Sequence, residues 1–223
     1  MMITMIVLTV KTSLEIGVEL VEPNKFVLTS VLPVLPVLIP IMLVFLLLFP
    51  VSSTTASYDY AEVLRRSLVF YQAQRSGNLS STNTVEWRQS SHLEDQGEEG
   101  EDLSGGYYDA GDTVKFGFPL ASALTVLSWG GLQYEEGYRL ARELEQLRET
   151  VRWGTDYLLK CHTAEYELYG QVGSSELDHN QWTRPEDSTT PRPAYKITRE
   201  RPGSDLAAET ASALAAASIL LEK

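Results

Sequence analysis

The hydrophobic positions of this chain form two regions with different patterns. Before Tyr58 they make one long apolar run, whereas from Asp59 onwards they recur every three or four residues, the spacing that predicts amphipathic helices. The predicted helices are Asp59–Gln74, Pro119–Trp129, Glu135–Lys160 with a break near Glu145, and Leu206–Glu222.

The predicted helix ends follow from residues that stop or start helices. Gly77 should follow the end of the first helix, and Gly130 with Gly131 should stop the second. Ser204 and Asp205 are good N-cap residues for the last helix, which is rich in alanine. Alanine and glycine on the inner faces favour helices that pack closely as antiparallel pairs.

No stretch alternates apolar and polar residues well enough to predict a strand, so the sequence predicts a mostly α domain. Its helices are interrupted by two long segments, Ser76–Val114 and His162–Gly203, which we interpret as loops. Loops of this length in a compact domain are usually functional.

The N-terminal region, residues 1–56, is interpreted as an extension that carries a signal peptide or a membrane anchor. Phe26–Tyr58 has no charged residue, and Val31–Phe49 is apolar throughout. Ile41–Phe49 fits the apolar core of a signal peptide, with cleavage expected after Ala56. We expect residues 57–223 to be secreted if the segment is cleaved, or held outside the membrane if it is not.

Composition and charge narrow the class of partner. The chain has 223 residues, 18 basic and 30 acidic, giving a formal net charge of -12. Such a balance disfavours nucleic acid, which binds clustered Lys and Arg. The single cysteine, Cys161, cannot form an internal disulfide, and the three histidines lack metal-site spacing, so we expect no metal or cofactor. A neutral small molecule or polymer is the simplest partner.

The candidate chemistry lies in the first long segment. Asp109 and Asp112 stand three residues apart with Gly111 between them, so both carboxylates can lie at one point and share a water molecule. Two other interpretations remain open at this stage, because such a pair can cap the following helix or bind a cation. On spacing alone, capping is favoured.

A longer string resembles the signature of glycoside hydrolase family 9, the inverting endoglucanases. It runs from Asp102 to Pro119 and reads DLSGGYYDAGDTVKFGFP. Further blocks follow the order of the family from Tyr58 to the C-terminus, at residues 67–77, 85–88, 147–162, 169–173, 178–182, 185–186 and 202–211.

The resemblance implies part of a six-hairpin (α/α)6 barrel that hydrolyses β-1,4-glucan with inversion of configuration. It assigns Asp112 as the general base and Asp109 as its partner on the same water. It also places His179 and Trp182 in the sugar groove. Tyr107 stands where the family often has Trp and is a further candidate for substrate binding, although packing is equally open for it.

The family's general acid is a glutamate near the end of its catalytic domain, and the resemblance places it beyond Lys223. Glu209 and Glu222 sit in a helical pattern and are interpreted as structural. The resemblance covers less than half of the family's catalytic domain, so we expect this chain alone to be inactive. Calcium sites of the family would also lie beyond Lys223.

Two rival functions remain open. One is a carbohydrate-binding protein without catalysis. The other is a calcium-binding structural protein, suggested by the acidic run Glu94–Asp102, although this run lacks the order of EF-hand ligands and is better interpreted as a solvated loop. Trp87, Trp129 and Trp153 are interpreted as packing residues.

Overall fold

The computed structural model describes residues 58–79 and 83–222, which lie within the unit Tyr58–Lys223. The predicted apolar segment and its cleavage site lie outside the described residues. Six helices lie in this part of the chain: α4 (Tyr60–Ala73), α5 (Gly117–Gln133), α6 (Glu135–Ala141), α7 (Leu144–Cys161), the short α8 (Ser175–Asp178) and α9 (Ser204–Leu221).

The four predicted helical regions are confirmed, with local corrections. The expected break near Glu145 lies between α6 and α7, where Arg142 adopts the left-handed conformation at φ 62°. Gly130 and Gly131 do not stop α5. They lie inside it. Position 131 requires glycine because a Cβ there would stand 2.5 Å from Leu147 Cδ2 and 3.0 Å from Leu220 Cδ1. The N-cap of α9 is Gly203, one residue before the predicted Ser204.

The helices of the predicted all-α fold are present in the described residues, but the expectation that the domain contains no strand is wrong, because a small antiparallel sheet is present. Its strands are β1 (Lys115–Phe116), β2 (His162–Ala164), β3 (Glu167–Val172) and β4 (Ala194–Ile197). Three of them lie inside the segment that we interpreted as the second loop. Strands of two to six residues are too short to display a clear alternation of apolar and polar positions.

The register of the sheet decides which segments meet. β3 lies in the centre: β4 runs along one edge, while β2 and β1 share the other. Lys115, at the start of β1, pairs with Val172, at the end of β3. Therefore the residues just before β1 and those just after β3 lie at the same end of the sheet.

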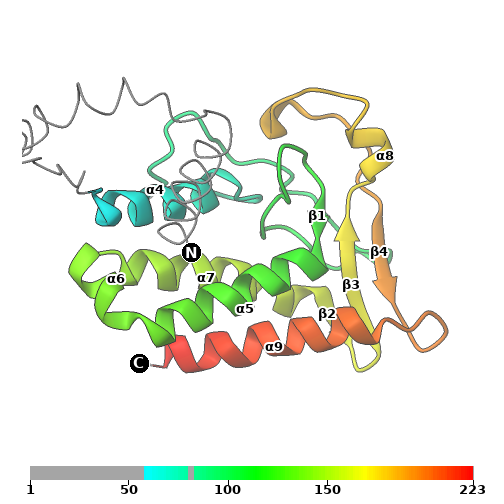
Figure 1. Cartoon of the computed structure of the whole chain (residues 1–223). Coiled ribbons are helices and arrows are strands. Elements are labelled where there is room, and N and C mark those ends of the chain that lie inside the picture. Colours follow the sequence, from blue (N-terminus) through cyan, green and yellow to red (C-terminus); the bar gives the residue numbers. More distant parts are fainter. Residues whose placement is uncertain (1–57, 80–82, 223) are drawn as a thin grey trace, which may run out of the picture. The chain divides into compact units, whose positions relative to one another are not determined.

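The helices α5, α7 and α9 run side by side, each with one end at the sheet (Figure 1). α7 is antiparallel to α5, as predicted: a Cβ at Gly154 would lie 2.6 Å from Leu124 Cδ1, while Gly131 faces Leu147. The pair α5 and α9 is parallel instead, because Gly117 contacts Leu206 and Gly131 contacts Leu220. Glycine at these positions lets the helix axes approach closely, as the sequence indicated.

The buried side chains form two clusters along these helices. The first joins the sheet to α5, α7 and α9; its buried members are Leu103, Ala121, Leu124, Tyr157, Leu158, Cys161, Leu168, Tyr169, Val172 and Ala213. The second runs from α4 through α7 to α9 and contains Leu68, Leu147, Val151, Ala217 and Leu220. The α7 face predicted from sequence, which includes Val151 and Leu158, is buried throughout.

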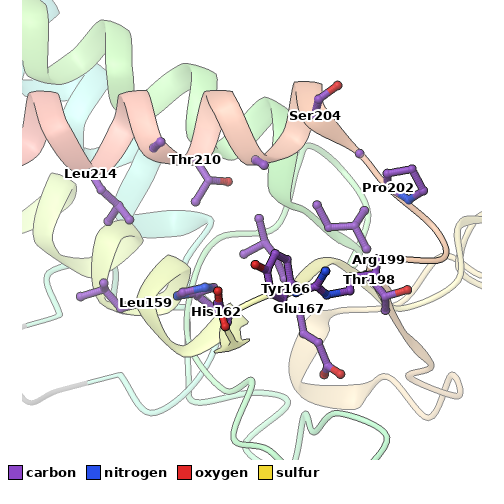
Figure 2. A pocket seen from close by; sticks show the side chains of 16 residues that line it. Leu159, His162, Tyr166, Glu167, Thr198, Arg199, Pro202, Ser204, Thr210 and Leu214 are labelled. Carbon is purple, nitrogen blue, oxygen red and sulfur yellow. The ribbon is translucent and has the colours of Figure 1, made fainter.

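A cavity of about 500 Å³ lies at the other end of the sheet, between α9, the end of α7 and the β2–β3 turn (Figure 2). Leu159, Tyr166, Ile197 and Leu214 supply much of its apolar lining. Within the described residues, α9 is the one helix long and apolar enough to cross a membrane, and only 22% of it is buried. In this domain α9 packs on α5 and α7. Its apolar composition therefore also fits a helix that packs in a domain core.

A buried ion network holds the first long segment on the sheet. Asp95 is 3% exposed, and its carboxylate lies 2.7 Å from Lys115 Nζ and 2.8 Å from Arg192 Nε. Burial alone would raise the pKa of Asp95, but the hydrogen bonds and charges of Arg192 and Lys115 outweigh it and lower that pKa. Burial lowers the pKa of Lys115 to about 8 against the pull of Asp95, so both groups are charged at neutral pH.

We expect Asp95→Asn to lower the free energy of unfolding by about 3–5 kcal/mol, because it leaves two cations buried without their counter-charge. Urea unfolding of the chain, followed by tryptophan fluorescence, measures this loss. Glu145→Gln is the matched control, since it removes a carboxylate that is 83% exposed and pairs with Arg148. The control should change the free energy of unfolding by less than about 1 kcal/mol.

The loss of unfolding free energy in Asp95→Asn should depend on pH. The lowered pKa of Asp95 stabilises the fold above the unfolded value of about 3.9, and this stabilisation disappears as the pH falls through the folded pKa. The difference between wild type and Asp95→Asn should therefore shrink as the pH falls below about 4. A difference that stays constant would contradict the assignment of the charge.

Candidate active site

The loop that carries the two aspartates is shaped by its own backbone. Gly106 precedes it at φ 76°, and a Cβ there would lie 2.6 Å from the Tyr157 ring, so only glycine fits. The Asp109 N–H donates to the Val114 carbonyl at 3.1 Å, which closes the loop. The Val114 N–H donates to Asp112 Oδ1 at 3.1 Å. Gly111 has an ordinary φ and open space around it, so this loop does not require glycine there.

The structure excludes the alternative that these aspartates cap the following helix, α5. The N-cap residue of α5 is Phe116, and no side chain forms a capping hydrogen bond there. The strand β1 separates the loop from the helix. The carboxylates of Asp109 and Asp112 are therefore not used to satisfy the free N–H groups at the start of α5.

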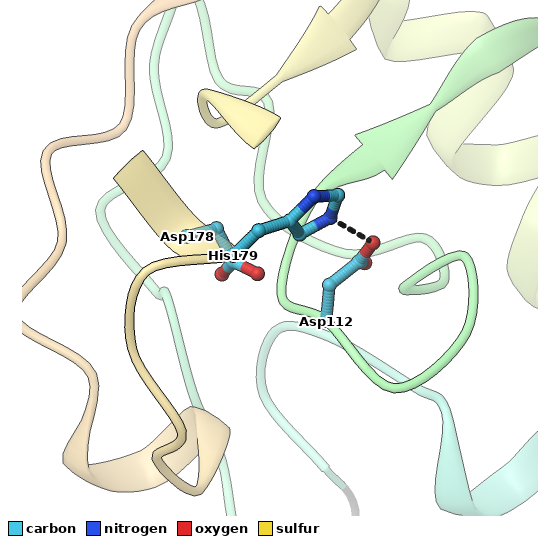
Figure 3. Close-up of side chains that lie close together, drawn as sticks. All are labelled: Asp112, Asp178 and His179. Carbon is cyan, nitrogen blue, oxygen red and sulfur yellow. Dashed lines mark hydrogen bonds and ion pairs between the residues drawn. The ribbon is translucent and has the colours of Figure 1, made fainter. Parts of the chain in front are cut away.

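The register of the sheet brings His179 to Asp112 (Figure 3). His179 Nε2 lies 3.2 Å from Asp112 Oδ2, so the ring N–H can donate to the carboxylate. The side chain of His179 is 58% exposed, whereas that of Asp112 is 13% exposed. We predicted that His179 contacts sugar; the structure also makes it a partner of Asp112.

Asp178, the residue before His179, binds the other side of the loop. Its Oδ1 accepts hydrogen bonds from the Thr113 N–H, at 3.1 Å, and from the Thr113 hydroxyl. Asp112, Asp178 and His179 each offer one ligand atom within 4.8 Å of the others, so a cation could be held there. Asp178 Oδ1 already accepts both donors of Thr113, which competes with such a role.

Asp109 differs from Asp112 in its surroundings. It is exposed at the surface of the loop, beside a small cavity of about 140 Å³ that Phe70, Tyr71 and Phe116 also line. Partial burial of its carboxyl group raises the pKa of Asp109, and the negative charge of Asp112 raises it further. Asp109 therefore holds a proton more readily than an isolated aspartate does.

The two aromatic candidates have opposite environments. Trp182 lies on the segment after α8 and is 95% exposed, so its indole face is open to a ligand. Tyr107 is 4% exposed, and its hydroxyl donates to the Thr150 carbonyl at 2.9 Å. Burial raises the pKa of Tyr107 to about 12. These contacts correspond to the packing alternative for Tyr107. Tyr107 also lines the small cavity beside Asp109, and its contact with substrate stays a prediction.

Other sequence interpretations need correction. Trp87 and Trp129 are 68% and 66% exposed, so they are not packing residues in the described part of the chain. Trp153 does pack, beneath the Arg75 guanidinium at 4.8 Å, and its ring N–H donates to the Gly106 carbonyl. The acidic run is solvated at Glu94, Glu98 and Glu99, but its Asp95 belongs to the buried ion network.

Sequence reasoning missed how the loop is held. Arg192 donates to the Thr113 carbonyl and also binds Asp95, so the ion network continues into the loop that carries Asp112. Arg192 lies 97 residues from Asp95 and 79 from Thr113, and no spacing rule connects them. Asp178 lies in the block at residues 178–182, and its place directly before the candidate His179 is the signal in the sequence that points to it.

Comparison with known proteins confirms the resemblance. Residues 60–223 match the family model described as "Glycosyl hydrolase family 9". The chain is similar to Endoglucanase 7 of Oryza sativa subsp. japonica, with 52% identity over 167 residues. That match covers 75% of this chain and 32% of the relative. The chain therefore spans about a third of the length of the first curated relatives that it matches.

Solved structures have the same fold over the matched residues. An endoglucanase from the termite Nasutitermes takasagoensis is 58% identical, with a TM-score of 0.74 over 75% of this chain and 39% of that one. A cellulase of C. cellulolyticum in complex with cellobiose is 33% identical, with a TM-score of 0.69, and the match covers 75% of this chain and 42% of that one.

We expect Asp112→Asn to lower the pKa of Asp109, because it removes the neighbouring negative charge. The pKa should stay above its usual value, since the partial burial of Asp109 remains. Carbon-13 NMR of labelled aspartate carboxyl groups measures this titration. Asp112→Glu keeps the charge and is the matched control; an equal shift in both variants would mean that charge is not the cause.

Proposed function

This chain belongs to glycosyl hydrolase family 9, and we propose that it forms the base side of the active site of an endo-acting hydrolase. The proposed reaction is hydrolysis of β-1,4-glucosidic bonds in cellulose and related glucans, with inversion of configuration. Its relatives are endoglucanases, and one cellulase structure contains cellobiose, which supports a β-glucan as the substrate. Because the chain spans a third of those relatives, the activity of the whole protein is a proposal.

One observation carries the proposal: the carboxylate of Asp112 lies free of helix capping, on a closed loop, in contact with His179. An inverting glycosidase needs a carboxylate base that activates water on the face opposite the leaving group. Asp112 is assigned this role. Asp109, whose raised pKa keeps it closer to its protonated form, would hold the same water without competing for its proton.

The sugar is proposed to bind along the segment that follows α8. The exposed face of Trp182 suits the apolar face of a pyranose ring, and His179 can donate to a hydroxyl when its ring N–H turns from Asp112. The reaction also needs a carboxylic acid to protonate the leaving oxygen. We assign that acid to the part of the catalytic domain that this chain does not span.

We also propose that the helices belong to a six-hairpin (α/α)6 barrel. α9 is long and apolar enough to cross a membrane, yet only 22% of it is buried, and it lines the cavity of Figure 2 through Ala207, Thr210 and Leu214. A helix of this composition normally buries its apolar side chains against other elements. Further hairpins of the barrel would cover this face.

We expect Asp112→Asn, in a protein that carries this chain within a complete catalytic domain, to abolish glucan hydrolysis, and Asp109→Asn to weaken it strongly. Asparagine keeps the shape of the side chain but cannot accept a proton, and positioned acid–base catalysis contributes about 10²–10⁴-fold. Reducing ends released from soluble cellulose measure the rate. Near-normal turnover by Asp112→Asn would refute the assignment.

The 223-residue chain by itself is the second arm of that assay. It should release no reducing ends, because it supplies the base without the acid. Retained binding to cellulose without hydrolysis by the complete domain would favour the alternative of a carbohydrate-binding protein. Hydrolysis by the chain alone that Asp112→Asn removes would mean that it contains an acid.

We propose that the protein enters the secretory pathway, with a mature N-terminus near Ser57. The apolar run after Lys25 and the small residues up to Ala56 support this. N-terminal sequencing of protein from the medium of an expressing eukaryotic culture tests it. Recovery from membranes of protein that still contains Ile41–Phe49 would instead support an uncleaved anchor.

A further inference from the structure

The segment that carries His179 and Trp182 has almost no apolar anchor. α8 is four residues long, and Asp178 is its single buried residue, at 8% exposure. Leu177 is 43% exposed, and the two candidate sugar contacts that follow are exposed as well. Hydrophobic burial therefore does little to hold this segment in place.

The carboxylate of Asp178 makes the connection instead. It accepts both the N–H and the hydroxyl of Thr113, 65 residues away in sequence. A buried carboxylate with two donors forms strong, charge-assisted hydrogen bonds. Because Thr113 follows Asp112 and Asp178 precedes His179, this contact neighbours the one between Asp112 and His179. Figure 3 shows Asp178 beside the latter.

The Asp112 loop, by contrast, has its own anchors. Arg192 donates to the Thr113 carbonyl, and the loop continues directly into β1. Loss of the Asp178 carboxylate would thus loosen α8 and the residues beside it while the loop stays in position, and the far end of the segment would keep the buried ion pair between Arg88 and Glu186. Because the two sides are anchored differently, substitution of Asp178 can displace His179 and Trp182 without unfolding the loop. A positioning role of Asp178 can therefore be told apart from a general role in folding.

We propose that Asp178 is a positioning residue, which holds His179 and Trp182 against the Asp112 loop through Thr113. This rests on the proposed function only in that Asp112 is taken as the base. In an active protein, Asp178 would bring the sugar-contacting segment and the base into one site without touching the substrate itself.

Nitrogen-15 NMR of the histidine rings tests this in the 223-residue chain without any need for hydrolysis, since the chain contains only three histidines. In the wild-type background, Asp112→Asn should shift the ring nitrogens of His179. In an Asp178→Ala background that response should fall by about tenfold or more, because bonds of this strength hold the segment in place. Asp178→Asn keeps the acceptor oxygen and should keep most of the response.

Two further variants keep the test decisive. Thr113→Val removes the hydroxyl bond to Asp178, together with a long contact of 3.4 Å from Arg192 to the same hydroxyl, and should weaken the response in a chain whose fold is intact. Asp187→Ala removes a nearby aspartate that is 66% exposed and pairs with Arg184 rather than with the loop, so it should leave the response unchanged. An undiminished response in both Asp178→Ala and Thr113→Val would overturn the proposal.

The hydrolysis assay distinguishes the two proposals. In a complete catalytic domain, Asp178→Ala should lower kcat/KM by about tenfold or more, with a rise in KM as Trp182 is displaced. If Asp112→Asn leaves hydrolysis intact while the NMR response is lost in Asp178→Ala, the proposed function fails and the positioning role stands. If Asp178→Ala keeps both kcat/KM and the NMR response, the positioning role fails.

Discussion

The buried carboxylate of Asp95 is the constraint on which the rest of this structure depends. Burying one charge is costly, and burying three is tolerable only if each has its counter-charge and its hydrogen bonds. Lys115 meets this condition through Asp95 and two backbone carbonyls, those of Leu103 and Gly105. Arg192 meets it through Asp95 and the Thr113 carbonyl. The arrangement of the three segments that supply the network gives each of these charges its counter-charge.

That arrangement fixes the candidate site. Lys115 is the first residue of β1, so its ion pair sets where the strand begins and hence where the preceding aspartate loop lies. The antiparallel register then places the end of β3 beside that loop, and α8 follows three residues after the strand. A second buried ion pair, between Arg88 and Glu186, ties the segment after Trp182 to the first long segment. The site is therefore assembled from loops, but buried charges determine their positions.

The sequence could predict what depends on local spacing. The helices and the buried face of α7 follow from apolar residues every three or four positions, and the pair Asp109 and Asp112 is visible as a motif. The sheet could not be predicted, because a strand as short as β1 has no period to detect. Nor could the ion network: in sequence, Asp95 is one acidic residue among many, and only the fold brings Arg192 to it across 97 residues.

The two halves of the candidate site are held by different contacts, and the difference matches the roles proposed for them. The loop with Asp112 is fixed by backbone hydrogen bonds, by β1 and by Arg192, so a base there would keep its position whether or not sugar is bound. The half with Trp182 is exposed and is joined to the loop by Asp178 and by the contact between His179 and Asp112, while the pair of Arg88 and Glu186 ties the residues behind it. A flat aromatic face needs only approximate placement to stack on a sugar ring, whereas a base must lie within hydrogen-bond distance of its proton. The stronger anchoring is thus found where the chemistry tolerates less displacement.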